Sequence, residues 1–240
     1  MKRATLNAVR DSLEAGRSIA VVTDLETGRQ ALVEPQAVCS GDLALPDETL
    51  ATVRDAIATD TCMSLDSASG RLFVHVHAPP PRLLIVGAVH IAEPLVAMAT
   101  LAGYAVTLID PRRGFAERQP FKGLNVRFDW PDQALTDLKP DARTAIVMLT
   151  HDPKLDEPAL AVALRSPAFY VGALGSRRTH AARLARLRKL GLSDEELAQI
   201  HGPVGLAIGA VTPAEIAISI MAEITQVRRQ IPPAKDRILV

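Results

Sequence analysis

The chain has 240 residues, of which 48% are hydrophobic, and its 27 Lys and Arg residues balance 27 Asp and Glu residues. This zero net charge excludes a general electrostatic attraction to nucleic acid or to an anionic membrane surface. Residues 1–16 lack the apolar core of a signal peptide, no apolar run is long enough to span a bilayer, and two cysteines are too few for a disulfide framework, so we expect a cytoplasmic protein.

Residues 1–78 predict a small α+β domain. Apolar residues at helical spacing predict a helix over 6–15, and two strands are expected at 18–23 and 30–34. A second helix over 47–58 precedes a hairpin that pairs 62–66 with 71–77 around a turn at 67–70. Residues 79–81 are three prolines, which hold the chain extended and form a linker.

Residues 82–240 predict a different architecture. Wholly or mostly apolar strands are expected at 83–86, 105–109, 144–149 and 169–174. Helices are expected at 91–102, 156–164, 176–190, 193–200 and 213–229, while His201, Gly202 and Pro203 are assigned to a loop. Strands that alternate with helices indicate an α/β fold, here a Rossmann-like doubly wound parallel sheet.

The turn after the first of these strands is typical of a phosphate-binding site. Gly87, Ala88, Val89 and His90 connect a strand to a helix, whose N-terminal amides can hold a phosphate. Asp110 ends the next strand, where a dinucleotide fold places the acid that binds ribose. Val89, however, occupies the position of the glycine that lets a pyrophosphate approach the backbone. A structural turn without a ligand is therefore the alternative interpretation.

Further candidates follow the later strands, because the carboxyl ends of parallel strands line the crevice of such a sheet. Arg112 lies just beyond Asp110, where it can bind a phosphate or remain a solvated surface charge. Thr150 and His151 close the strand at 144–149, and His151 is either a ligand contact or an ordinary polar loop residue.

The segment after the strand at 169–174 combines glycines, a helix cap and cations. Gly172 and Gly175 leave backbone amides accessible, and Ser176 can cap the following helix. Arg177 and Arg178 in its first turn oppose the usual preference for acidic residues there, which makes sense if an anion binds. The predicted ligand-binding residues are Gly87, Ala88, Val89, His90, Asp110, Arg112, Thr150, His151, Gly172, Gly175, Ser176, Arg177, Arg178, Gly205 and Gly209.

The sequence contains no G-x-S-x-G elbow, H-E-x-x-H pair or P-loop lysine motif, and we predict neither a catalytic residue nor a metal ligand. We expect structural or incidental roles for Cys39 and Cys62, because neither has an evident activating setting.

Six stretches together resemble the XdhC/CoxI family of accessory proteins for molybdenum hydroxylases such as xanthine dehydrogenase and carbon monoxide dehydrogenase. The stretches are 84–92, 106–112, 149–155, 170–178, 201–210 and 212–220. Residues 1–78 resemble a shortened form of the family's N-terminal part, because its Gly-Gly-Cys-Val-Glu stretch is missing.

The resemblance implies a cofactor chaperone rather than an enzyme. Such a protein binds the molybdenum cofactor, as molybdopterin or its dinucleotide form, and delivers it to an apo-hydroxylase after sulfuration by a cysteine desulfurase. The predicted residues would then hold the phosphate of the cofactor.

Two alternatives remain, an NAD(P)-dependent oxidoreductase and a nucleotide-sensing Rossmann domain. The apolar residues Ile216, Ile220 and Ile224 of the last helix belong either to the core or to a homodimer seam.

Overall fold

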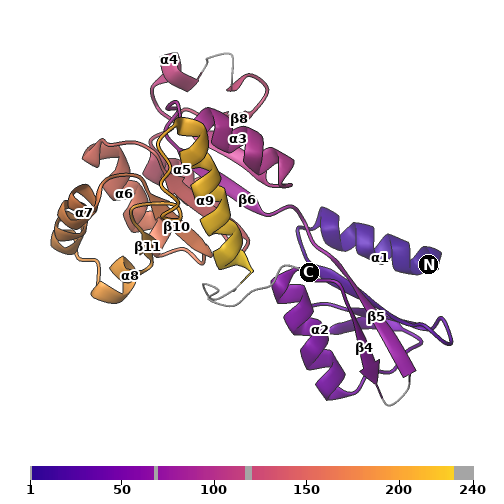
Figure 1. Cartoon of the computed structure of the whole chain (residues 1–240). Helices are drawn as coiled ribbons and strands as arrows, with labels where there is room; N and C mark the ends of the chain where they lie inside the picture. The colour runs from indigo at the N-terminus through magenta and orange to yellow at the C-terminus, as the bar shows by residue number, and fades with distance from the viewer. Residues whose placement is uncertain (1, 68–69, 117–120, 230–240) are drawn as a thin grey trace. The chain divides into compact units, whose positions relative to one another are not determined.

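The computed structural model describes residues 2–67, 70–116 and 121–229 and divides into two compact units, Met1–Pro79 and Pro80–Val240 (Figure 1). The predicted hairpin turn at 67–70 lies partly outside the described residues, as do the last residues of the predicted second domain, 230–240.

The first unit is an antiparallel sheet between two helices. Its strand order is β3-β2-β1-β5-β4. Alternate residues of β1 pack on opposite faces: Ile19 and Val21 contact α1, and Ala20 and Val22 contact α2. The elements are α1 (Arg3–Glu14), β1 (Ile19–Asp24), β2 (Gln30–Val33), β3 (Val38–Gly41), α2 (Asp47–Thr59), β4 (Met63–Ser67) and β5 (Gly70–His77). The predicted small α+β fold is confirmed, and β3 is an additional edge strand.

The second unit is a six-stranded sheet of order β11-β10-β9-β6-β7-β8 in which every pair is parallel. This order is that of the doubly wound dinucleotide fold, so the predicted Rossmann-like sheet is confirmed. Its elements are β6 (Arg82–Val86), α3 (Ala92–Leu101), β7 (Ala105–Ile109), α4 (Arg113–Ala116), β8 (Asn125–Arg127), α5 (Pro131–Leu138), β9 (Thr144–Met148), α6 (Pro153–Leu164), β10 (Tyr170–Ala173), α7 (Arg177–Lys189), α8 (Asp194–Ala198), β11 (Ile200–His201) and α9 (Pro213–Arg228).

Helices cover both faces of this sheet, which explains the continuous apolar run of β6. Leu83 and Ile85 belong to the core cluster under α3 and α9, and Leu84 and Val86 belong to the one under α5 and α6. Figure 1 shows α3 and α9 lying together on one face. On α9, Ile220 and Ile224 are fully buried in this core, and Ile216 packs against it. The apolar stripe of α9 is therefore core, not an exposed seam.

Several short elements were not predicted. The strand β11 includes His201, which the sequence assigns to a loop; it pairs with β10 over only two residues, too few for a periodic pattern. The helix α6 begins three residues earlier than predicted, because Asp152 caps it and Pro153 occupies its first position. No helix among the described residues is long and apolar enough to cross a membrane.

Candidate functional site

The reversal of strand order between β6 and β9 places the two turns that follow these strands in direct contact. Gly87 has a φ of 111°, and a Cβ atom there would lie 2.6 Å from Thr150 Cγ2. The backbone amide of Leu149 donates to the Val86 carbonyl at 2.8 Å, which keeps the two strand ends together. The predicted residues Gly87 and Thr150 therefore meet at the topological switch point, where open α/β sheets bind ligands.

Asp110 ends β7 beside this point, and its carboxylate is already bound by the protein. Oδ2 accepts from the Ala88 amide at 2.8 Å, and both oxygens accept from the Arg112 guanidinium. Burial raises the pKa of Asp110, but hydrogen bonds from Arg112 and Ala88 outweigh burial and leave the pKa below its ordinary value. Asp110 is 1% exposed. Its role in the structure is thus to join the Gly87 turn to Arg112, whose side chain is 42% exposed.

The predicted histidines lie at the surface of this edge. His90 and His151 are both exposed, whereas Thr150 between the turns is buried. Val89 packs against the core under α3 and α9. Thr150 donates its hydroxyl hydrogen bond to Asp156, so its polar atom faces the protein rather than the solvent.

The N-terminus of α7 presents positive charge beside the end of β10. Gly175 has a φ of 142°, and Ser176 caps α7 by accepting from the Thr179 amide. Arg177 and Arg178 are exposed in a first turn that contains no acidic residue. Helix dipole and two guanidinium groups together favour an anion at this turn.

Gly172 has a packing role. It lies inside β10, and a Cβ atom there would lie 2.5 Å from Val204 Cγ2 and 2.8 Å from the Tyr170 hydroxyl oxygen. The close approach of these side chains requires a glycine in this strand.

Glu223 of α9 fixes the loop that contains the predicted residues Gly205 and Gly209. Its Oε2 accepts from the Tyr170 hydroxyl and from the Gly205 amide, and Oε1 contacts His201 Nδ1 at 3.3 Å. Burial raises the pKa of Glu223, but these partners outweigh burial and lower it. Gly209 lies further along, in an exposed part of the loop with no atom within 4 Å of a Cβ at that position.

Glu223→Gln is expected to lower the free energy of unfolding by about 2 kcal/mol, because a neutral amide cannot accept from all three partners at once. Urea denaturation monitored by circular dichroism measures this change. Glu215→Gln, at the exposed start of the same helix, is the matched control and should cost about 1 kcal/mol or less. Equal losses in the two variants would contradict a central role for Glu223.

A buried ion pair lies next to Thr150, and no pattern in the sequence indicates it. Asp156 of α6 and Arg183 of α7 are each 2% exposed, and their charged groups lie 3.7 Å apart. Arg183 Nη2 donates to the Leu174 carbonyl at 2.7 Å. Burial raises the pKa of Asp156 to about 6, although Thr150 and Arg183 act in the opposite direction. Only the expectation that a buried Asp or Arg needs a partner could have singled these residues out.

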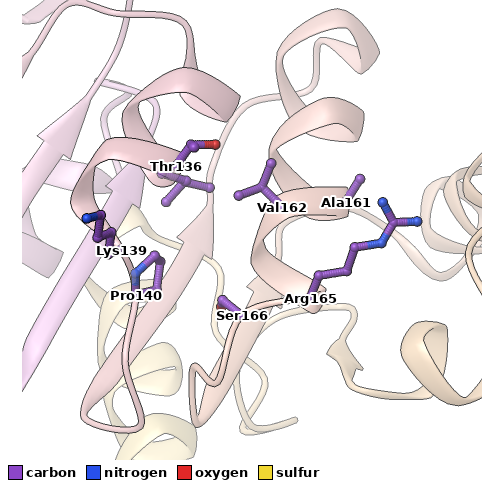
Figure 2. A pocket seen from close by; sticks show the side chains of 8 residues that line it. Thr136, Lys139, Pro140, Ala161, Val162, Arg165 and Ser166 are labelled. Atoms are coloured by element: carbon purple, nitrogen blue, oxygen red, sulfur yellow. The ribbon is translucent and has the colours of Figure 1, made fainter.

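A separate hollow of about 400 Å³ lies between the C-terminal ends of α5 and α6 (Figure 2). These helix ends precede β9 and β10, so the hollow lies at the opposite edge of the sheet from the Gly87 turn. Arg165 at its rim extends toward Glu196 of α8, and Arg82 donates to the Leu138 and Lys139 carbonyls beside it. Two helix C-termini carry partial negative charge, which disfavours an anionic ligand here.

Metal-binding chemistry has no evident place in the described ranges, where no group of three or more His, Cys, Asp or Glu residues is arranged to hold an ion. Cys62 is exposed and not in a disulfide.

Comparison with protein families gives one match, over residues 83–224, to the model described as the XdhC Rossmann domain. The matched region contains the Gly87 turn, Asp110, the α7 N-terminus and Glu223.

Three curated relatives are similar to the chain. An uncharacterized Escherichia coli protein, YqeB, is 34% identical over 67% of this chain, and the match spans 30% of its own length. A Bacillus subtilis protein, named as a probable xanthine dehydrogenase component, is 27% identical over 96% of the chain and 67% of its own length. The molybdenum cofactor insertion chaperone PaoD from Escherichia coli is 44% identical over 37% of the chain and 28% of its own length.

Among solved structures, a xanthine dehydrogenase from Bacillus halodurans has a TM-score of 0.75 and 28% identity. The similarity covers 95% of this chain and 67% of that one, so it includes both units.

Proposed function

The chain belongs to the XdhC Rossmann domain family, and from this premise we propose that it binds the molybdenum cofactor and assists its insertion into a molybdenum hydroxylase. The cofactor is cargo in this proposal, held by its phosphate and passed to the apo-enzyme. The name of the related PaoD, a molybdenum cofactor insertion chaperone, supports this role.

The observation that carries the proposal is the basic N-terminus of α7. Arg177 and Arg178 are exposed there beside Gly175 and the Ser176 cap, at the carboxyl edge of the sheet. A terminal phosphate would accept hydrogen bonds from these guanidinium groups and from helix amides. Arg112 extends the positive charge of the edge from β7. The pterin ring would then lie along the turns after β6 and β9.

Two features weigh against the alternatives of an NAD(P)-dependent oxidoreductase and a nucleotide sensor. Asp110, the expected ribose ligand, already accepts from Ala88 and Arg112. Val89 stands where a dinucleotide site needs glycine. We propose a xanthine or carbon monoxide dehydrogenase type of hydroxylase as recipient, and a cysteine desulfurase as the enzyme that sulfurates the cofactor while it is held.

The first test is the identity of the bound ligand. The protein is produced in cells that make molybdenum cofactor, purified without oxygen, and assayed by mass spectrometry for molybdenum, pterin and nicotinamide. We expect pterin at close to one equivalent, and its mass distinguishes molybdopterin from the dinucleotide form. Bound nicotinamide without pterin would overturn the proposal.

The combined change Arg177→Ala and Arg178→Ala is expected to lower affinity for the cofactor by about 10- to 100-fold, because each charge-assisted hydrogen bond contributes about 1.5–3 kcal/mol. Retention of cofactor during anaerobic gel filtration measures it. Arg188→Ala with Lys189→Ala removes the same charge from the last turn of α7 and should leave affinity unchanged. Similar losses in both double variants would show that only net charge matters.

A further inference from the structure

We infer that Asp156 and Arg183 are positioning residues of the crevice, whose buried ion pair holds the turns after β9 and β10 in the geometry that binds the cofactor. This inference rests on the proposed function for its ligand and on the contacts of the apo-protein for its mechanism. Neither residue is among those predicted to touch the ligand.

The contacts form one continuous path beneath the carboxyl edge. The Thr150 methyl group faces Gly87, and the Thr150 hydroxyl donates to Asp156. Asp156 faces Arg183, which donates to the Leu174 carbonyl. Leu174 directly precedes Gly175 and is tied to β9 through the Met148 carbonyl at 2.8 Å. The pair therefore sets the relative position of three ligand-facing turns.

The pair is poorly explained as a device for stability. Two charges removed from water carry a desolvation cost that their attraction often fails to repay. Arg183 Nη1 is buried without a hydrogen-bond partner in the described part of the chain, so the guanidinium is not fully satisfied. A pair retained at this cost, and placed at the floor of the crevice, fits a role in binding geometry.

The ionised form of Asp156 is the one that attracts Arg183, so crevice geometry and proton binding are coupled. The charged and titratable groups around Asp156 are Arg183 from α7, His151 and Asp152 from the turn after β9, and Arg112 from the turn after β7. The raised pKa of Asp156, about 6, places the change between mildly acidic and neutral pH.

Asp156→Asn tests the inference because it keeps the shape and an acceptor for Thr150 but not the charge. The matched control is Glu157→Gln, the same chemical change one residue along α6, where Glu157 pairs with Arg186 of α7. The probe is molybdenum cofactor released anaerobically from a purified hydroxylase, with affinity measured from pH 5 to pH 8.

At pH 8, we expect Asp156→Asn to bind the cofactor about tenfold more weakly than wild type. At pH 5 the two proteins should bind alike, because Asp156 is then protonated. Glu157→Gln should follow wild type at every pH, which separates the effect from titration of the cofactor's own phosphate. Equal binding by Asp156→Asn and wild type at pH 8 would overturn the inference.

A second measurement needs no ligand. Amide hydrogen exchange in the apo-protein should be faster at the turns around Thr150 and Gly175 in Arg183→Met than in its control, Arg186→Met. If wild type binds no cofactor but this difference appears, the proposed function fails and the positioning role stands. Unchanged exchange at both turns in Arg183→Met would refute the positioning role itself.

Discussion

Gly87→Ala is expected to lower the free energy of unfolding by about 4 kcal/mol. The backbone φ of 111° is a conformation that residues with a Cβ adopt only with strain, at a cost of about 1–3 kcal/mol. The added methyl group would also lie 2.6 Å from Thr150 Cγ2, and forced overpacking costs about another 1–3 kcal/mol. Because Thr150 is buried and hydrogen-bonded, it cannot move aside freely. Urea denaturation gives the value.

Gly103→Ala is the matched control for this change. Gly103 also has a positive φ, 82°, but no atom lies within 4 Å of a Cβ at that position. It should therefore lose only the backbone contribution, about 1–2 kcal/mol. If the two variants lose equal stability, the contact between the turns after β6 and β9 is not as close as the structure shows.

Asp156→Asn is expected to abolish most of the pH dependence of stability between about pH 4 and pH 6. The pKa of Asp156 is raised to about 6, so the folded protein holds a proton in this window that the unfolded chain has released. Stability therefore falls as pH rises through the window, by about 3 kcal/mol for a shift of roughly two units. Without an ionisable group, the variant should be up to about 3 kcal/mol more stable than wild type at pH 8.

Denaturant titrations at pH 4, 6 and 8 measure this difference, and Glu157→Gln should retain the wild-type dependence. A variant less stable than wild type at pH 8 would mean that the ion pair stabilises the fold. Taken with the weaker cofactor binding expected of the same variant, a gain in stability would be a trade between stability and function.

The order of strands and helices in the second unit could be predicted from sequence because the signals are local. The run from Leu83 to Val86 is apolar throughout because helices cover both faces of the sheet. Thr212, Pro213 and Glu215 form a capping box that marks the start of α9. Short edge strands escaped prediction: β8 has three residues and β11 has two, so neither shows a period.

The candidate site divides in the same way. Gly175, Ser176 and the two arginines that follow are readable because a cap and a first turn are consecutive in sequence. The sequence also indicated Asp110, but not that its carboxylate would be bound by Ala88 and Arg112.

By itself, therefore, the sequence determined the fold class, the family and the strand ends that face the crevice, since all of these follow from periodicity and adjacent residues. Only the tertiary structure decided how buried polar groups are paired. Glu223 and Tyr170 are 53 positions apart in the chain, and Asp156 and Arg183 come from different helices. Such pairs leave no periodic trace, because the free energy of burying a charge depends on which partner the folded chain brings beside it.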